Sequence, residues 1–401
     1  MRGSITLTNI GQLVTNDPER DGTLGIVENA AVSIENGLVA WVGHAADAPE
    51  AAVTHDCAGS AVLPGFVDPH THLVFAGDRA DEFGRRLRGE SYEQIMAAGG
   101  GIQSTVSATR AATLGELTDA ALGRLRRVQA AGTTTVEVKS GYGLDLEHEK
   151  RLLAVAAAAG SAVALDVVPT FLGAHAVSDE FAGDANGYID YLAEAVLPEC
   201  APLARFCDVF CDEGVFTVDQ SRRVLEAGKK HGLIPRLHAN QLGYSGGARL
   251  AVEVGAISAD HLDHIDDDDI AALHAAGTVA VLLPGVSFSL RLPQPRARDL
   301  WEAGVTVALG TDCNPGTSNI ETMPFVIALA CLEMGLTPEQ AVWSATRGGA
   351  LALGLEDRGQ VAVGAQGDLT VLGHESYVHL AYRPDAPAVR KVVKRGLVVA
   401  G

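Results

Sequence analysis

The sequence predicts an α/β fold: a (β/α)8 barrel of the TIM type, joined to a small composite β-sandwich domain built from both chain ends. Eight short apolar runs follow one another from Leu63 onwards, and Ala-rich helical stretches separate most of them. Buried strands that alternate with helices are typical of such a barrel. The two chain ends instead hold runs in which apolar and polar residues alternate, the pattern of half-buried strands.

The eight predicted barrel strands share one pattern, an apolar run that ends in polar residues. A glycine often precedes the run, and it is suited to end the preceding helix because it adopts the left-handed conformation without strain. Residues 114–131 and 218–231 are examples of the helical stretches. In chain order the runs are LPGFVDPHTH, TTTVEVKSGYG, ALDVVPTFLGAH, ARFCDVFCDEG, IPRLHANQ, AISADHL, TVAVLLPG and VTVALGTD.

The chain ends, residues 1–62 and 357–401, are expected to form the β domain, and residues 63–356 the barrel. Asn36 and Gly37 lie between two alternating runs, which is a strong signal for a β-hairpin. We expect the two ends to pair into one domain, with two independent β flaps as the alternative.

Composition excludes several classes of function. The chain of 401 residues carries a formal net charge of −20, which repels phosphate backbones and anionic lipid surfaces. We therefore expect no nucleic-acid or membrane partner, and an anionic small substrate would need a local cationic pocket. The longest apolar stretch, residues 152–165, is too short to span a bilayer.

The N-terminal segment does not resemble a signal peptide, and six cysteines are scattered along the chain. We therefore expect a cytoplasmic protein with reduced thiols. Cys207 and Cys211 have three residues between them, which is not a zinc or redox spacing, and we expect both to be core residues.

Four histidines and one aspartate lie at the carboxyl ends of the predicted strands, where barrel enzymes have their catalytic residues. Each of them alone is more readily explained as a hydrogen-bonding structural residue. Their combination on strands one, five, six and eight instead favours a site for a borderline divalent ion such as Zn²⁺ or Fe²⁺. The residues are His70, His72, His238, His261 and Asp312.

These stretches carry a family resemblance across essentially the whole chain. LPGFVDPHTH, RLHANQ, SADHL and GTDCNPGTS resemble the amidohydrolase superfamily. Within it, HTHLVFAGDRADEF, KSGYGL and FLGAHAV are similar to the imidazolonepropionase family of histidine breakdown. This resemblance implies hydrolysis of the cyclic amide 4-imidazolone-5-propanoate to N-formimidoyl-L-glutamate. It also implies one divalent or trivalent metal ion per chain, zinc or iron.

Matched position by position, the resemblance assigns roles to individual residues. Catalytic roles fall to His261, Asp312 and Gln241. Some relatives carry a glutamate at the position of Gln241, and an amide cannot accept a proton, so the identity of the base stays open. The implied metal ligands are His70, His72, His238 and Asp312, and the implied substrate contacts are Arg79, Tyr142, His175, Gln241, Asn314, Gly316 and Thr317.

The chemistry that follows is hydrolysis by a water that the ion activates. Asp312 is able to take the proton of this water and deliver it to the leaving ring nitrogen. His261 either stabilises the developing oxyanion or shares the proton transfer. Arg79 offers a planar fork that matches the carboxylate of the substrate tail, which a lysine would not reproduce.

The position of Lys139 helps to predict whether the site holds one metal ion or two. Many binuclear relatives bridge two metals through a carboxylated lysine at the end of strand four, whereas Lys139 lies on predicted strand two. We therefore expect a mononuclear site, with Lys139 in a buried ion pair or hydrogen bond. Glu213, at the end of strand four, is a weaker candidate for a contact behind the ligands.

Two groups of polar residues are expected to lie outside the site. The acidic run at residues 266–269 is expected to be a solvated helix start, because carboxylates favour the N-terminal end of a helix. The remaining histidines are expected to be surface or structural residues: His44, His55, His148, His231, His264, His274, His374 and His379.

Two rival functions stay open at this point. Another cyclic amidase or a deaminase on the same scaffold would keep the metal ligands without needing the anchor of Arg79, Tyr142 and His175. A non-catalytic scaffold protein would keep the fold and usually lose ligands. The expected partner is a small anionic cyclic amide, and the expected assembly is a homodimer.

Overall fold

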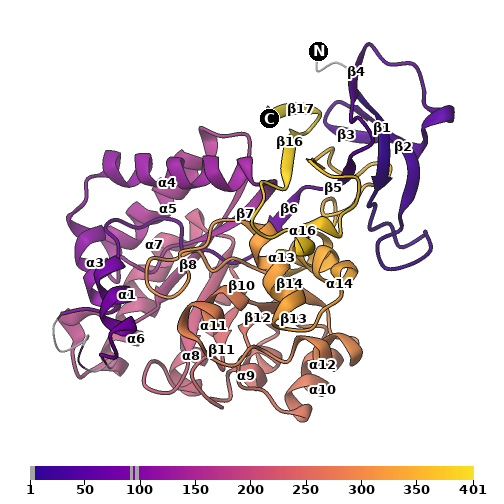
Figure 1. Cartoon of the computed structure of the whole chain (residues 1–401). Coiled ribbons are helices and arrows are strands. Elements are labelled where there is room, and N and C mark those ends of the chain that lie inside the picture. The colour runs from indigo at the N-terminus through magenta and orange to yellow at the C-terminus, as the bar shows by residue number, and fades with distance from the viewer. Residues whose placement is uncertain (1–4, 91–93, 95–98) are drawn as a thin grey trace.

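The computed structural model describes residues 5–90, 94 and 99–401. Within these residues, eight parallel strands form a continuous sheet in the order β14, β13, β12, β11, β9, β8, β7, β6, and the two-residue β10 pairs with β9. The predicted (β/α)8 barrel is therefore confirmed (Figure 1). Its strands are β6 (Phe66–Asp68), β7 (Thr133–Lys139), β8 (Asp166–Ala174), β9 (Phe206–Cys211), β10 (Ile234–Pro235), β11 (Leu237–Ala239), β12 (Ser258–His261), β13 (Val279–Leu282) and β14 (Val307–Leu309).

Helices follow the strands and begin at the capping residues that the sequence offers. At α10 the side chain of Asp266 accepts the backbone N–H of Asp269, and Asp269 returns the bond, so the acidic run opens a helix as expected. The helices are α1 (Ala80–Leu87), α3 (Ile102–Ala111), α4 (Leu114–Ala130), α5 (Leu146–Ser161), α6 (Ala185–Tyr191), α7 (Leu197–Cys200), α8 (Val218–Lys230), α9 (Gly247–Glu253), α10 (Asp267–Ala276), α11 (Pro284–Leu290), α12 (Ala297–Glu302), α13 (Met323–Leu332), α14 (Pro338–Trp343), α15 (Gly349–Ala352) and α16 (His379–Tyr382).

The barrel closes where the segment after β6 meets the segment after β14. Thr71 forms a parallel bridge with Cys313, and the Asp312 N–H donates to the His70 carbonyl at 3.0 Å. The first strand was predicted to run to His72, but it ends at Asp68. Pro69 has no N–H to donate to a ladder, so pairing stops there while the chain stays extended.

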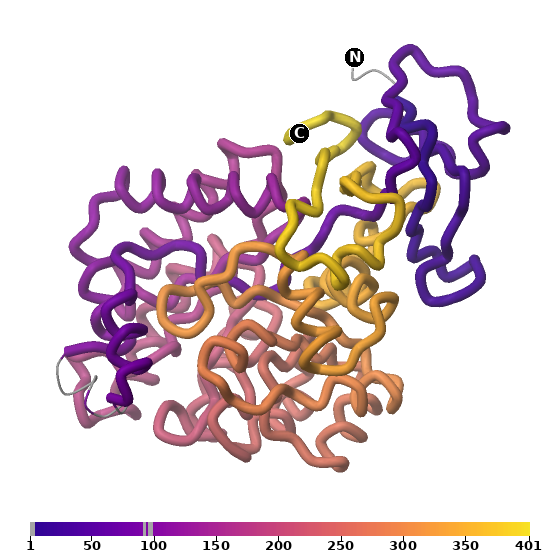
Figure 2. Tube along the Cα trace, viewed as in Figure 1, coloured from indigo at the N-terminus to yellow at the C-terminus, as the bar shows by residue number. Residues whose placement is uncertain are grey.

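The predicted composite β domain is confirmed, because β5 from the N-terminal part pairs antiparallel with β15 from the C-terminal part. Segments from the two ends lie side by side in Figure 2. The Asn36-Gly37 hairpin joins β2 to β3, with both residues at positive φ, 52° and 89°. The strands are β1 (Ile5–Leu13), β2 (Val27–Glu35), β3 (Leu38–His44), β4 (Val53–Asp56), β5 (Ala61–Pro64), β15 (Leu369–Leu372), β16 (Val389–Lys394) and β17 (Leu397–Ala400).

Each domain has its own apolar core. In the β domain, residues such as Leu7, Ile34 and Val371 pack together, and Val39 after the hairpin donates to the carbonyl of Ala365 just before β15. The sheet therefore folds over its own core. The expected division of the chain at residues 62 and 357 stays a prediction.

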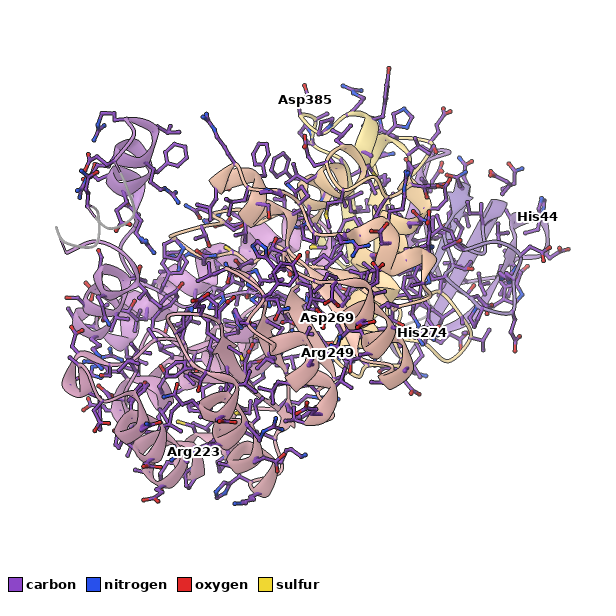
Figure 3. The ribbon with its side chains drawn as sticks, turned by 90° about the horizontal axis from the view of Figure 1, so that it is seen from below. His44, Arg223, Arg249, Asp269, His274 and Asp385 are labelled. Atoms are coloured by element: carbon purple, nitrogen blue, oxygen red, sulfur yellow. The ribbon has the colours of Figure 1, made fainter. Side chains whose placement is uncertain are left out.

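The exterior carries ion pairs that contribute little to stability. Arg249 of α9, 46% exposed, lies 3.7 and 3.8 Å from the exposed Asp266 and Asp268 as well as beside the buried Asp269 of α10. Figure 3 shows Arg249 and Asp269 together on the barrel, with His44 at the far end in the β domain. Pairs in which both side chains are exposed, such as Arg249 with Asp268, stabilise a fold by about 0–1 kcal/mol. Across the described ranges, no helix is both long and apolar enough to cross a bilayer.

Candidate metal centre and active site

Five potential metal ligands converge at the carboxyl ends of the barrel strands. They form two groups that share His70, one with His238 and His261 and one with His72 and Asp312, and the ligand atoms within each group lie within 4.8 Å of one another. None of the five exposes more than 3% of its surface. Water is largely excluded here, so electrostatic interactions among these groups are strong.

Two buried carboxylates fix the orientation of two of these imidazoles. The Nδ1 atom of His70 lies 2.6 Å from Asp260 Oδ2, and Nδ1 of His238 lies 2.9 Å from Asp208 Oδ1. A carboxylate only accepts, so each imidazole donates from Nδ1 and keeps the lone pair of Nε2 for another partner. This is the arrangement that metal-ligating histidines commonly show.

The atoms left free fit a cation. Among the described residues, His70 Nε2 and Asp312 Oδ1 are buried without a hydrogen-bond partner, although they lie 3.4 Å apart. His72 Nε2 lies 3.3 Å from the same Asp312 oxygen. Native proteins rarely leave buried polar atoms unpaired, and binding of a metal ion is one established reason for such atoms. The donor set of imidazole and carboxylate suits zinc or iron.

The protonation states agree with ligand behaviour. Burial lowers the pKa of His70 and of His72 well below the ordinary value, and neighbouring cationic groups add to the effect. Burial raises the pKa of Asp312, against the opposing influence of His261 and His238. Neutral imidazoles around a desolvated carboxylate favour a bound cation, because it would stabilise the charged form of Asp312.

A buried ionic network lies behind the ligands. The Lys139 ammonium is 2.9 Å from Glu137 and 2.8 Å from Asp208, so the predicted buried ion pair of Lys139 is confirmed. Arg236, fully buried, donates to Asp260 at 2.6 Å. Burial alone would raise the pKa of Asp208, but His238, Lys139 and Arg236 lower it well below its usual range. Asp208 is therefore a fixed negative charge behind His238.

Replacing Asp208 with asparagine should weaken metal binding. The amide removes the charge that holds His238 in its donating tautomer, and loss of such a partner typically costs about 10- to 100-fold in metal affinity or activity. Competition with a chelator measures the affinity. Asp268→Asn, at a side chain that is 88% exposed, is the matched control and should behave as wild type. Unchanged affinity in Asp208→Asn would contradict this role.

The expected tail-binding residues gather beside the ligands. The His175 ring stacks on His72 with centroids 4.9 Å apart, and the Tyr142 ring lies 5.3 Å from that of His175. Burial raises the pKa of the Tyr142 hydroxyl, as does Asp312, whereas the charge of Arg79 opposes the rise. The Tyr142 hydroxyl therefore interacts electrostatically with both Asp312, the candidate metal ligand, and Arg79, the candidate tail anchor.

Arg79, from the segment between β6 and α1, contacts the loop after β14. A Cβ atom at Gly316 would lie 2.2 Å from Nη1 of Arg79, so a side chain there would displace the guanidinium from its present position. Asn314 organises the loop: its amide nitrogen donates to Asp312 Oδ2 at 2.9 Å, and its oxygen accepts the N–H groups of Gly316 and Thr317. The side chain of Asn314 is thus engaged within the protein, and its role towards substrate stays a prediction.

The loops after β9 and β11 border the same end of the barrel. Asp212 accepts the backbone N–H of Gln241 and of Leu242, both at 2.7 Å. A groove of about 670 Å³ lies between these loops, lined by residues 212–219 with Tyr244 and Ser245. Glu213 lines this groove and is exposed, so it is not among the buried residues behind the ligands.

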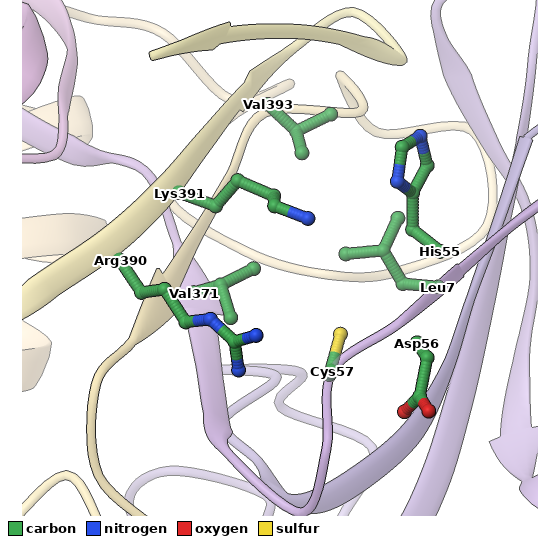
Figure 4. A pocket seen from close by; sticks show the side chains of 8 residues that line it. All are labelled: Leu7, His55, Asp56, Cys57, Val371, Arg390, Lys391 and Val393. Carbon is green, nitrogen blue, oxygen red and sulfur yellow. The ribbon is translucent and has the colours of Figure 1, made fainter. Parts of the chain in front are cut away.

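A second cavity, in the β domain, is too small for a substrate. Cys57 borders it with Arg390 and Lys391 (Figure 4), but its volume is about 10 Å³, room for about one water molecule. Burial raises the pKa of the Cys57 thiol to about 11, so it stays protonated. Cys207 and Cys211 are fully buried in the barrel core, as expected.

Asp208, Asp260, Glu137 and Arg236 were not identified from the sequence. Each lies inside an apolar run such as ARFCDVFC. Burial of a charged side chain there without a partner would cost much folding free energy. That signal marks them as buried polar residues. It does not indicate which strand supplies the partner.

Comparisons with known proteins agree with this geometry. The amidohydrolase family matches residues 61–399. An imidazolonepropionase from Mycolicibacterium smegmatis is 50% identical over 397 residues, covering 99% of this chain and 98% of that protein. An imidazolonepropionase from Streptomyces coelicolor is 51% identical over 399 residues, covering 99% of each.

Solved structures of similar fold include a deaminase. The solved structure of an adenosine deaminase from Xanthomonas campestris with bound zinc superposes with a TM-score of 0.74 at 20% identity, covering 98% of this chain and 92% of that one. At that identity the likeness concerns the fold alone. The match over most of the chain and the half-identical relatives decide the family: this chain belongs to the amidohydrolases and, among them, to the imidazolonepropionases.

Proposed function

We propose that this chain hydrolyses 4-imidazolone-5-propanoate to N-formimidoyl-L-glutamate in histidine degradation. The relatives that match this chain at about 50% identity over nearly their full length are named imidazolonepropionases. The observation that carries the proposal is the convergence of a metal-binding cluster with Arg79, Tyr142 and His175 at one end of the barrel. The reaction adds one water across the C–N bond beside the ring carbonyl.

The cofactor of the proposed reaction is one zinc or iron ion. His70, His72, His238 and Asp312 would hold it, supported by their burial and by the unpartnered His70 Nε2 and Asp312 Oδ1 among the described residues. When bound, such an ion supplies Lewis acidity towards water and towards the ring carbonyl. The zinc in the adenosine deaminase of the same fold supports zinc as the first choice.

The side chains divide the remaining work. Asp312 takes the proton that the attacking water loses and delivers it to the ring nitrogen as the C–N bond breaks. His261, which lies with its ring 5.2 Å from that of His238, stabilises the negative charge on the carbonyl oxygen or shares the proton transfer. Gln241, as a neutral amide, orients the substrate rather than accepting a proton.

The direct test mixes the metal-loaded protein with 4-imidazolone-5-propanoate. Loss of the ring absorbance and appearance of N-formimidoyl-L-glutamate by mass spectrometry are expected. Absence of ring opening in a protein that holds its metal would overturn the proposal. A cytoplasmic homodimer remains a prediction, which size-exclusion chromatography with light scattering checks for the assembly.

Arg79→Ala should remove the anchor of the propanoate tail. Truncating one partner of a buried charge pair costs about 2–4 kcal/mol, so kcat/KM should fall roughly 30- to 1000-fold. Metal content should not change. Arg79→Lys should recover only part of the loss, because it supplies charge without the planar fork. If wild type opens an imidazolone without the tail as efficiently as the full substrate, Arg79 is not the anchor.

A further inference from the structure

Arg79 immediately precedes helix α1, and one acidic residue of that helix holds this arginine. Nε and Nη2 of Arg79 donate to a single oxygen of Glu82, Oε2, at 2.9 and 2.7 Å. The other oxygen, Oε1, accepts the backbone N–H of Gly101 at 3.0 Å, just before α3. The two side chains are only 15% and 13% exposed, so solvent screens this pair weakly. Glu82 therefore joins Arg79 to a second segment of the fold.

The geometry of this pair leaves one edge of the guanidinium available. A guanidinium has a side edge, formed by Nε and Nη2, and an end edge, formed by Nη1 and Nη2, and either edge is able to bind a carboxylate through two hydrogen bonds. Glu82 occupies the side edge. Nη1 has no hydrogen-bond partner within the described part of the chain, and it lies against Gly316. The end edge therefore points to the loop of the proposed site.

A third residue of α1 docks the helix on the same loop. Arg86, one turn beyond Glu82, donates to the carbonyl of Gly316 at 3.3 Å. Residues four apart lie on one face of a helix, so this face of α1 presents Glu82 and Arg86 together. Burial lowers the pKa of Arg86, and the nearby charge of Arg79 adds to the effect. Two cations therefore converge at this loop, and the carboxylate of Glu82 offsets the repulsion between Arg79 and Arg86.

We propose that Glu82 is a positioning residue that sets the specificity for the substrate tail, by fixing the plane of Arg79 so that its end edge faces the propanoate. This proposal rests on the proposed function, since it requires a substrate with a carboxylate tail. Glu82 itself does not touch the substrate. A competing role gives the opposite result. If Glu82 merely paired with Arg79 until the substrate carboxylate displaced it, removing the charge of Glu82 would strengthen substrate binding instead of weakening it.

The test compares Glu82→Gln with Glu90→Gln. A glutamine at 82 places an amide donor where the carboxylate has an acceptor, so it cannot serve both Arg79 and Gly101. Glu90 is a matched control, because its Oε2 also accepts Nε of an arginine, Arg85, at 2.7 Å and lies 2.7 Å from Nη2 of that residue, outside the proposed site. Metal content and thermal melting of both variants establish that they fold.

Glu82→Gln is expected to raise KM for 4-imidazolone-5-propanoate about tenfold, the effect of one charged hydrogen bond, with kcat changed less than about threefold. For an imidazolone without the tail, its kcat/KM should equal that of wild type. Glu82→Asp keeps two acceptor oxygens on a shorter stem and should give an intermediate KM. It also serves as the test if Glu82→Gln does not fold.

Two results would overturn the proposal separately from the proposed function. A KM at or below the wild-type value in Glu82→Gln or Glu82→Asp, with wild type active, overturns the positioning role alone. An equal loss on the tailed and tailless rings does the same, because it indicates a general structural effect. If neither wild type nor Glu90→Gln opens the ring, the proposed function fails, and the role of Glu82 fails with it.

Discussion

His238→Ala is expected to release the metal ion and abolish turnover while the barrel still folds. His238 offers Nε2 to the cluster, 3.4 Å from Nε2 of His72 and in one group with His70 and His261. Losing the ion removes several kcal/mol of transition-state stabilisation, so kcat should fall at least about 10³-fold. Asp208 keeps its ion pair with Lys139, so no isolated charge is left in the core.

Metal analysis and steady-state kinetics on the same preparation check this result. His231→Ala, at an exposed histidine after α8, is the matched control and should retain both metal and activity. Wild type should hold one ion per chain, because the Lys139 ammonium already lies between Glu137 and Asp208. Full occupancy with normal activity in His238→Ala would contradict the ligand assignment, and two tightly held ions in wild type would contradict a mononuclear site.

The fold was predictable from the sequence because its signals are local and repeated. Each barrel strand is an apolar run, and the carboxyl ends of parallel strands must meet at one end of a closed barrel. Residues at those ends, such as His238 and His261, could therefore be grouped without knowing any distance. The pairing of the two chain ends was also predictable, because alternating runs of the same kind lie on both sides of the barrel.

The contacts behind the site were not predictable in the same way. Asp260 bonds His70 across the barrel, from a position 190 residues later in the chain, and no spacing rule specifies such a partner. Glu82 shares a helix with Arg79, but a charged pair on a helix is usually a solvated surface feature. Only the burial of both side chains and the contact with Gly101 distinguish this pair from ordinary surface pairs.

Backbone conformation was equally hidden from the sequence. His261 and Leu262 both have positive φ, 77° and 60°, and Asp312 has a φ of 48°. Non-glycine residues in this region are uncommon and tend to cluster at functional sites, where the surrounding structure holds them. Here His261 is the last residue of β12, Leu262 follows it, and Asp312 follows β14, so all three lie at the strand ends that carry the cluster.

His261→Asn is expected to lower kcat by roughly 10²- to 10⁴-fold, the usual contribution of a general acid–base residue. Asparagine tolerates positive φ well, so the variant should keep the turn after β12 and the melting temperature of wild type. Its short amide cannot reproduce an imidazole that gains and loses a proton. Burial lowers the pKa of His261 to about 3, against the opposing charge of Asp312, so the residue begins as a neutral acceptor.

The decisive measurement is metal content alongside kcat, because the geometry allows two roles. His261 lies within ligand distance of His70 and His238, yet Nδ1 of His261 is buried without a hydrogen-bond partner among the described residues, 3.8 Å from Asp263. If His261 acts on the substrate, His261→Asn keeps one ion per chain and loses turnover. If it is a fifth ligand, metal and turnover fall together. Activity within a few-fold of wild type would exclude both roles and leave the proton transfer to Asp312 alone.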